Sequence, residues 1–337
     1  MTRKYSHLTF EERVALIRKI HVNHPRFAAL VQTIEDCRVH TKLLQKPQCI
    51  LIEGDKGVGK TRLIDTIVGK HPRTRVEGSL KTLTIIPIFK AATPEQATPN
   101  LLVSALLEEL GDLHPDAGNS ARKLRKLRHL MKECGVEQLF LDEFQHFVDR
   151  QTDYHFNRVS DWLKLFIDAT NISVILLGIP NSHLLLDANE QLQRRFQRLE
   201  VLRPFGWTTT EERKEFCAFL TEFGKQLPLE ETVNLGEPTM AFRFFCASQG
   251  YISTIATLLE QATIMALKNG QERLDLTHLA AAAKYANGIC PAGENPFLVD
   301  HRELKLPEPR KEEKVEIPAH LKRKGRLDLT GRLRRTK

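Results

Sequence analysis

The octapeptide Gly54-Asp55-Lys56-Gly57-Val58-Gly59-Lys60-Thr61 decides the fold of this chain. It matches the pattern GxxxxGK[ST], in which glycines let the backbone wrap closely so that successive N–H groups point at phosphate oxygens. An apolar run, residues 49–52, precedes it, and a helix-like stretch, residues 62–68, follows it. A strand, a glycine-rich loop and a helix N-terminus in this order form a phosphate-binding loop, so the sequence predicts a nucleotide-binding α/β domain.

Two side chains of this loop have distinct predicted roles, beside the backbone that all eight residues contribute. Lys60 is expected to reach the β- and γ-phosphates of ATP, and Thr61 to place its hydroxyl on Mg²⁺. The alternative is a glycine-rich turn that matches by chance, and the strand before it and the helix after it disfavour that interpretation. ATP and Mg²⁺ are therefore the predicted ligands.

A second motif, Leu139-Phe140-Leu141-Asp142-Glu143, is a short apolar run that ends in two carboxylates. A buried parallel strand has this pattern, with its charged end at the edge where ligands bind. Asp142 is expected to hold Mg²⁺ through its water shell, and Glu143 to orient and polarise the attacking water. Strands also end in acidic residues for structural reasons, but the phosphate loop upstream favours catalysis. The pair predicts hydrolysis of ATP rather than binding alone.

The composition is that of an ordinary globular protein. The chain has 337 residues, 41% of them hydrophobic and 27% charged, and it contains no apolar run of the roughly 18 residues that a membrane span needs. No apolar secretory core follows the basic N-terminus, so a cytoplasmic protein without membrane association is expected. The cysteines are scattered without a C-x-x-C pair, which favours reduced, buried side chains over a zinc site or disulfides. They are Cys37, Cys49, Cys134, Cys217, Cys246 and Cys290.

The positive charge is concentrated at the C-terminal end. Residues 301–337 hold 13 Lys and Arg against 6 Asp and Glu, a net of +7, whereas the whole chain carries +8. A basic tail of this kind often binds nucleic acid. The alternative, equally weighted, is a solvated terminus that binds nothing specific.

The pattern along the chain changes near residue 206. Before it, five predicted strands alternate with helices, and after it only helices are predicted, which indicates a parallel α/β core followed by a helical lid. Pro87 in the second strand suggests a position at the sheet edge. The expected strands are residues 49–53, 82–89, 139–143, 173–178 and 200–202. The expected helices are residues 10–20, 25–42, 62–68, 100–110, 119–134, 158–169, 192–197, 210–225, 238–248, 253–268 and 277–287.

Four parts follow from these elements. Residues 1–45 form an N-terminal helical segment, residues 46–206 the nucleotide-binding core with a five-stranded parallel sheet, and residues 207–290 the helical lid. Residues 291–337 are proline-rich and charged, which is typical of a linker and tail.

The phosphate loop, the strand ending in Asp-Glu and the helical lid together resemble the AAA+ P-loop ATPases. In that class a polar sensor of the γ-phosphate follows the fourth strand, where this chain has Gly178-Ile179-Pro180-Asn181, so Asn181 is the sensor candidate. The arginine finger, which acts on a neighbouring subunit's nucleotide, often lies where this chain has Gln193-Arg194-Arg195-Phe196. Arg194, Arg195 and Arg198 are the candidates, and a solvated basic helix face is the alternative.

Within AAA+, residues 8–300 resemble the TniB/TnsC-like regulators of DNA transposition. The resemblance depends on short motifs that lie both before and inside the core. They are Leu8-Thr9-Phe10-Glu11-Glu12-Arg13, His24-Pro25-Arg26-Phe27, Leu141-Asp142-Glu143-Phe144-Gln145-His146, Gly178-Ile179-Pro180, Gln193-Arg194-Arg195-Phe196 and Asn295-Pro296-Phe297. One position departs from many AAA+ proteins, because Gly250-Tyr251-Ile252-Ser253 has serine where a lid arginine is usual. Slow hydrolysis is therefore expected.

The resemblance implies a function. ATP-bound subunits would assemble head to tail, as a ring or helical filament, around duplex DNA. A target-selection protein of the TniQ type would nucleate or stop the assembly, and a transposase would stimulate hydrolysis and disassembly. DNA contacts would go mainly to phosphates and be independent of sequence. The candidates are Lys90, Thr98, Arg122, Lys123, Lys126 and Arg128.

Two other functions remain open on the sequence. A helicase loader of the IstB type or a replication initiator has the same fold and also binds DNA, although no helix-turn-helix follows the lid. A signalling ATPase switch would not touch DNA at all. Salt-dependent binding of non-specific duplex in the presence of ATP separates the last class from the others.

Overall fold

The structure is a computed structural model that describes residues 5, 7–77, 82–95, 98–147, 153–183, 186, 190–196, 198–285 and 295–310. Cys290, the end of the helix predicted at 277–287, and nearly all of the basic tail lie outside these ranges. The chain forms two compact units, which are described separately. The α/β unit contains Arg26–Lys56 and Lys60–Leu202, and the helical unit contains Met1–Pro25, Gly57–Gly59 and Arg203–Lys311.

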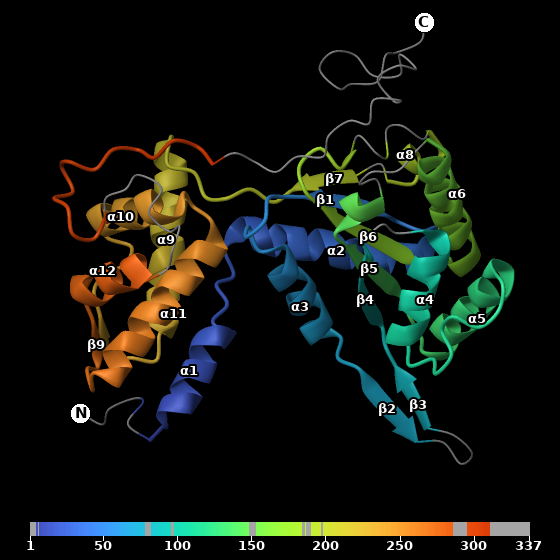
Figure 1. The fold of residues 1–337 in the computed structure, drawn as a ribbon, viewed down its shortest axis with the longest axis horizontal. Helices are drawn as coiled ribbons and strands as arrows, with labels where there is room; N and C mark the ends of the chain where they lie inside the picture. The colour runs from blue at the N-terminus through green and yellow to red at the C-terminus, as the bar shows by residue number, and fades with distance from the viewer. Residues whose placement is uncertain are drawn as a thin grey trace, which may run out of the picture. The chain divides into compact units, whose positions relative to one another are not determined.

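The α/β unit is built on the five-stranded parallel sheet that the sequence predicted (Figure 1). The strand order is β4-β5-β6-β1-β7, with Glu53 opposite Gly178 on one side and Val201 on the other. The three central strands have continuous apolar runs because both faces of a parallel sheet are covered. The bounds are β1 (Ile50–Glu53), β4 (Ile88–Ala92), β5 (Gln138–Asp142), β6 (Ser173–Gly178) and β7 (Arg198–Val201).

Helices cover this sheet and supply its core. Alternate residues of the strands, such as Leu51, Leu139 and Val174, belong to one cluster with Leu106 and Phe166 of the neighbouring helices. The carboxyl end of β5 continues into a 3-10 turn, Phe144–Phe147. The helices are α2 (Pro25–Leu44), α3 (Lys60–Lys70), α4 (Pro99–Glu109), α5 (Ser120–Glu133), α6 (Asp153–Thr170) and α8 (Glu190–Gln193).

The strand predicted over residues 82–89 is wrong as a single element. It divides into two strands, β3 (Thr82–Ile85) and β4. Strand β3 pairs antiparallel with an unpredicted strand, β2 (Thr74–Glu77), whereas β4 joins the main sheet. The division falls at Pro87, which has no N–H to continue a ladder and whose carbonyl accepts from Glu137 N and Gln138 N at 2.9 and 3.2 Å. The edge position that Pro87 suggested is confirmed, because β4 ends the sheet.

The helical unit packs aromatic and aliphatic side chains from several helices into a second core, around Phe216, Phe244 and Leu258. The first helix begins with a capping box, in which Thr9 and Glu12 bond reciprocally. Two unpredicted two-residue strands, β8 (Glu231–Thr232) and β9 (Arg273–Leu274), pair in this unit. Its helices are α1 (Phe10–Lys19), α9 (Thr210–Gln226), α10 (Pro238–Ser248), α11 (Ile252–Lys268) and α12 (Leu276–Tyr285).

A buried arginine connects α1 to the rest of the helical unit. Arg13 donates through Nε and Nη2 to the carbonyl of Pro228, at 2.9 and 2.6 Å, and it forms an ion pair with Glu272. The carboxylate raises the pKa of Arg13 by hydrogen bonding, against the opposing effect of burial. The guanidinium therefore stays charged and holds α1 against two loops.

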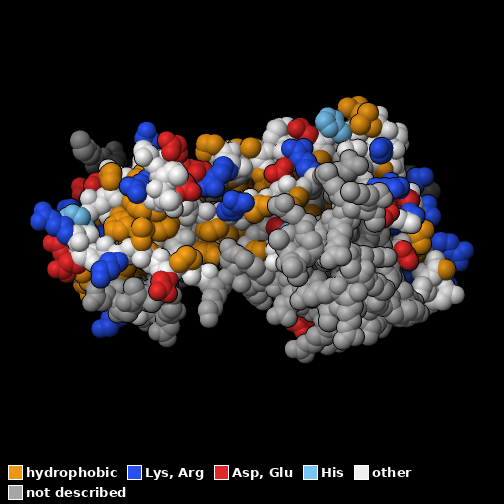
Figure 2. All heavy atoms as spheres, turned by 90° about the horizontal axis from the view of Figure 1, so that it is seen from above, with side chains coloured by type: hydrophobic (Ala, Val, Ile, Leu, Met, Phe, Trp, Pro, Cys, Tyr) orange, Lys and Arg blue, Asp and Glu red, His pale blue; other side chains and the backbone are white. Residues whose placement is uncertain are grey.

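The surface of the described part is mixed in charge. On the face seen in Figure 2, Lys and Arg side chains are interspersed with Asp and Glu. None of the helices that the structure describes combines the length and apolar character that crossing a bilayer requires.

Candidate nucleotide-binding and catalytic site

The phosphate loop lies between β1 and α3, as the sequence predicted. Gly57 and Gly59 have φ angles of +88° and +107°, a region that residues with a Cβ rarely adopt. Helix α3 begins at Lys60, so its unpaired N–H groups and the positive end of its dipole lie at the end of the loop. The backbone therefore has the features that an anionic phosphate requires.

Lys60 is a buried cation, with 8% of its surface exposed. Its Nζ donates to the carbonyls of Gly54 and Asp55, at 2.6 and 3.1 Å. Burial lowers the pKa of Lys60, while the nearby charges of Asp142 and Glu143 oppose that change. An ammonium group has three donors, so a third remains for a phosphate oxygen.

Asp142 and Glu143 close the carboxyl end of β5. Asp142 Oδ1 accepts from Glu143 N at 2.9 Å. Burial raises the pKa of Asp142, and the charge of Glu143 adds to the effect, whereas Lys60 lowers it. Glu143 itself has a φ of +56°, in the left-handed region, which costs a residue with a Cβ about 1 kcal/mol or more. Such local strain is common at functional sites.

Gln145 fixes the position of Glu143, a role that the sequence interpretation missed. Its side-chain Nε2 donates to Glu143 Oε2, and its Oε1 accepts from Ile179 N at 3.3 Å. Gln145 is buried. The motif that carried the family resemblance includes this residue, but a glutamine two positions after a carboxylate indicates no contact by itself.

The turn after β6 is held at two further points. Ser182 Oγ, which is buried, donates to Ile179 O at 2.6 Å. Glu53 Oε1, at the end of β1, accepts from His183 N and lies 2.8 Å from His183 Nδ1. Asn181, the predicted sensor, has a φ of +69° within this turn. Glu53 and His183 were not predicted, because their contact depends on the adjacency of β1 and β6.

The three candidate finger arginines have different surroundings. Arg195 Nη2 pairs with Asp168 Oδ1 at 2.5 Å. Arg198 is the first residue of β7, and its Nε pairs with Glu200 Oε1 at 2.9 Å. Arg194 is exposed, and its side chain makes no ion pair within the described part of the chain. Arg194 is thus the candidate best able to reach a neighbouring subunit.

The predicted DNA contacts are also unequal. Lys123 was a predicted DNA contact, but it is 8% exposed and its Nζ donates to Ser104 Oγ at 2.9 Å. Lys126 is paired with Asp112 at 2.6 Å. The helix is amphipathic, and Lys123 faces the α4–α5 connection instead of solvent, whereas Lys126 is partly exposed and reaches Asp112 of that connection from the helix surface. Arg122 and Arg128 on the same helix are exposed.

The remaining two candidates, Lys90 and Thr98, lie in β4 and at the N-terminus of α4. Lys90 was expected in a segment after the second strand, but it lies within β4, because the strand begins after Pro87. Its Nζ pairs with Asp65 at 2.9 Å, and both side chains are about half exposed. Thr98 caps α4 by accepting from Leu101 N at 3.2 Å.

The residues present fit Mg²⁺ as well as phosphate. Mg²⁺ keeps several waters and usually takes one or two protein oxygen ligands together with substrate phosphates. The Thr61 hydroxyl, in the first turn of α3, and the Asp142 carboxylate are oxygen ligands of this kind. Ser253, at the position where many AAA+ proteins have a lid arginine, lies in the first turn of α11.

Comparison with known proteins gives a family match and a fold. A family model described as the bacterial TniB protein matches residues 13–205. The fold is similar to that of the ORC1 protein of Aeropyrum pernix, solved in complex with DNA, with a TM-score of 0.57 and 16% identity over 81% of this chain and 69% of that one.

Two further structures have the same likeness. The Aeropyrum pernix ORC2 protein, solved as ADPNP and ADP complexes, gives a TM-score of 0.56 at 14% identity, covering 81% of this chain and 71% of that one. Cdc6p from Pyrobaculum aerophilum gives a TM-score of 0.55 at 12% identity, covering 80% of this chain and 70% of that one. No curated protein sequence matches the chain. Identities this low establish a shared AAA+ fold and not a shared activity.

Proposed function

Because the chain belongs to the bacterial TniB family, we propose that it is an ATP-dependent regulator of DNA transposition. It binds and hydrolyses ATP with Mg²⁺ and assembles on duplex DNA. In that state it links a target-selection protein of the TniQ type to a transposase, and hydrolysis disassembles it. The observation that carries the proposal is the grouping of Lys60, Asp142 and Glu143 beside a glycine-rich loop in a chain of this family.

The chain's own residues divide the work of hydrolysis. The loop N–H groups and Lys60 bind the phosphates of the substrate, and Thr61 and Asp142 hold Mg²⁺, which neutralises charge developing on the phosphoryl oxygens. Glu143 orients the attacking water and accepts its proton. Asn181 is the proposed sensor of the γ-phosphate, since its turn is anchored to β1 through Glu53 and His183.

Assembly is proposed to share the nucleotide between neighbouring subunits. Arg194 is the preferred finger because its exposed side chain makes no ion pair among the described residues. An interface of this head-to-tail kind either closes into a ring or continues as a filament. An arginine finger contributes about 10³- to 10⁵-fold to the rate of hydrolysis in P-loop NTPases.

DNA is proposed to bind through phosphate contacts. Arg122, Lys90 and Thr98 stay candidates, because each is at the surface or at a helix N-terminus where a phosphate can approach. Lys123 does not, since its side chain is buried and its ammonium group donates to Ser104 Oγ. Lys126 stays a candidate on the same terms as Lys90, because each is about half exposed and pairs with one aspartate. The basic tail, residues 301–337, either adds phosphate contacts or recruits a partner.

Electron microscopy and fluorescence anisotropy with ATP or ADP test the proposal. ATP, and not ADP, should support oligomers on a duplex of unrelated sequence, and affinity should fall steeply with salt. A mixture of Arg194→Ala and Lys60→Ala chains should regain part of the activity, because one intact interface forms from two defective chains. A chain that stays monomeric with ATP and DNA would refute the assembly.

A second candidate function follows from the fold. The likeness to ORC1 and Cdc6p favours an initiator or helicase-loader type of AAA+ ATPase as the alternative. Stimulation of hydrolysis by a transposase supports the first proposal, whereas stimulation by a replicative helicase supports the second. A chain that hydrolyses ATP but binds no DNA at any salt concentration would instead be a signalling switch.

A further inference from the structure

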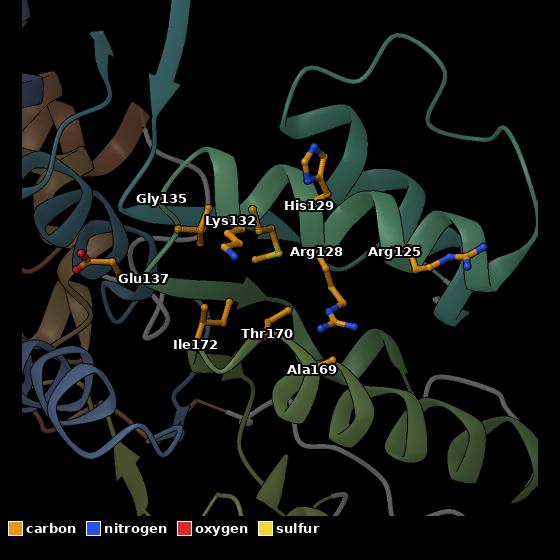
Figure 3. Close-up of a pocket in the computed structure, with 11 residues that line it drawn as sticks. Arg125, Arg128, His129, Lys132, Gly135, Glu137, Ala169, Thr170 and Ile172 are labelled. Carbon is orange, nitrogen blue, oxygen red and sulfur yellow. The ribbon is translucent and has the colours of Figure 1, made fainter.

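A cavity of about 480 Å³ lies at the amino ends of β5 and β6, whereas the phosphate loop follows the carboxyl end of β1. Its walls come from the C-terminal half of α5, the connection from α5 to β5, and the end of α6 with the residues that lead into β6 (Figure 3). Its size is within the range of small-ligand pockets, enough for a few side chains of a partner. The lining residues are Arg125, Arg128, His129, Met131, Lys132, Gly135, Val136, Glu137, Ala169, Thr170 and Ile172.

The rim of this pocket is strongly basic. Arg125, Arg128 and Lys132 are spaced three and four residues apart, so they share one face of α5. All three are exposed, and none forms an ion pair within the part of the chain that the structure describes. Figure 3 shows the Arg128 side chain reaching across the pocket toward Ala169 and Thr170.

The acidic lining residue does not neutralise this charge. Glu137 Oε1 pairs with Lys42 Nζ at 2.9 Å, and Glu137 Oε2 with Arg38 Nη1 at 2.5 Å. Figure 3 shows the Glu137 carboxylate turned away from Arg128. The Glu137 carboxylate is therefore neutralised by two cations of α2, and the three cations of α5 remain available to bind a negatively charged ligand.

The floor of the pocket is apolar. Met131, Val136 and Ile172 are buried hydrophobic side chains. Gly135, with a φ of +63°, adds a backbone surface without a side chain. Thioether side chains such as that of Met131 adapt to differently shaped partners. The site thus combines a floor that favours an apolar group with a rim that favours negative charge.

We propose that this pocket binds an acidic peptide segment of a partner protein, with one apolar side chain on the floor and flanking carboxylates on Arg125, Arg128 and Lys132. Guanidinium groups bind carboxylates in a bidentate geometry. Duplex DNA offers the negative charge, but its phosphate backbone has no apolar group to place in a concave apolar site. Because the floor is apolar, we infer that Arg128 binds a protein partner rather than DNA.

The location lets the partner and the nucleotide bind at the same time. Glu137 immediately precedes β5, whose other end is Asp142, and Ile172 precedes β6, which leads to the turn of Asn181. At about 3.3 Å per residue, the five residues of β5 separate the two sites by about 15 Å. The inference does not depend on ATP hydrolysis, so a failure of either proposal leaves the other intact.

A peptide selection tests the inference. A library of random 12-residue peptides displayed on phage is selected on the full chain, and the consensus peptide is synthesised and measured by fluorescence anisotropy. Aspartate or glutamate flanking an apolar residue should dominate the consensus. Arg128→Ser should weaken peptide binding at least tenfold, whereas Arg75→Ser, which replaces an exposed arginine of β2 outside the pocket, should leave binding unchanged.

A second variant tests shape separately from charge. Ala169→Phe should fill the pocket and abolish peptide binding without altering the net charge, and unchanged thermal unfolding midpoints establish that both variants fold. A selection without acidic residues, or equal binding by the Arg128→Ser and parent chains, overturns the proposal. Loss of binding to a 20-base-pair duplex in Arg128→Ser but not in Arg75→Ser would assign the pocket to DNA and overturn the proposal too.

Discussion

The side-chain amide of Gln145 donates a hydrogen bond to the carboxylate of Glu143, and the carbonyl of the same amide accepts one from Ile179 N. A carboxylate can only accept and a peptide N–H can only donate, so the chemistry of the partners fixes which end of the amide faces which. One buried side chain thereby connects the proposed water-orienting glutamate to the strand end that carries the proposed sensor.

Replacing Gln145 tests whether it positions Glu143. Gln145→Leu keeps the size but removes both hydrogen bonds, so kcat for ATP hydrolysis should fall about 10- to 100-fold, as for other residues that orient a reactive group. KM should change little, because the phosphate loop is intact. Gln145→Glu should in addition shift the pH profile upward, since a second carboxylate beside Glu143 raises the pKa values of the pair. A Leu variant with the parental kcat would show that the contact is only structural.

The roles of Glu143 and Lys60 are separable by steady-state kinetics and nucleotide binding. Glu143→Gln should retain ATP and Mg²⁺ while reducing hydrolysis at least a hundredfold, because Asp142 and the loop remain. Lys60→Ala should weaken ATP binding itself. Parental hydrolysis by Glu143→Gln would mean that another group orients the water.

Most of the α/β unit follows from short-range patterns. The loop Gly54–Thr61 and the run 139–143 locate the two central motifs, because buried parallel strands and phosphate loops leave strong local signals. The contacts of Glu53 with His183, and of Gln145 with Ile179, join strands that are adjacent in space but far apart in sequence. No local pattern predicts them.

The division at Pro87 and the burial of Lys123 illustrate the same limit. An apolar, β-branched run predicts extended backbone but not which partner each half will pair with. A basic amphipathic helix such as α5 predicts charge on its surface, but its pairing with Asp112, Asp116 and Ser104 depends on the conformation of the α4–α5 connection.

Asp142 should reduce the stability of the nucleotide-free protein. Burial raises its pKa, so its ionised form is less favourable in the folded than in the unfolded chain. Asp142→Asn should therefore raise the thermal unfolding midpoint at pH 7 while abolishing Mg²⁺-dependent hydrolysis. The destabilisation that accompanies a raised pKa exists only at pH values where the carboxyl is ionised. The difference in unfolding midpoint between variant and parent should therefore vanish as the pH falls below 3.8. A variant less stable than the parent at pH 7 would contradict this sign.

Glu137, in contrast to Asp142, should stabilise the folded protein when its carboxyl is ionised. Burial raises its pKa, but the ion pairs with Lys42 and Arg38 outweigh burial and hold it below the ordinary value of 4.5. A depressed pKa contributes stability that is present above pH 4.5 and lost as the pH falls through the folded-state pKa. Glu137→Gln should lower the unfolding midpoint at pH 7 but not in strong acid. Glu108→Gln, at an exposed glutamate, is the control. If both variants lower the unfolding midpoint equally, the ion pairs of Glu137 do not account for the effect.

Arg13 is expected to contribute more to the free energy of unfolding than a surface arginine of the same helix. Arg13→Met removes donors to Pro228 O and a partly buried ion pair, so the free energy of unfolding in urea should fall by about 2–3 kcal/mol. Arg18→Met is the matched control, since its pair with Glu260 is exposed and such pairs contribute about 0–1 kcal/mol. Equal losses in the two variants would mean that burial does not decide the contribution.

The break at Pro87 also has a consequence for how this protein can change over time. The β2–β3 ribbon forms a ladder of its own and extends from the main sheet in Figure 1, while β4 alone supplies the sheet edge. Insertions, deletions or charge changes in the ribbon therefore leave the register of Ala92 against Asp142 untouched. Sequence change in this appendage should therefore leave the geometry of the candidate site unaltered, and a foreign sequence can be grafted there on the same grounds.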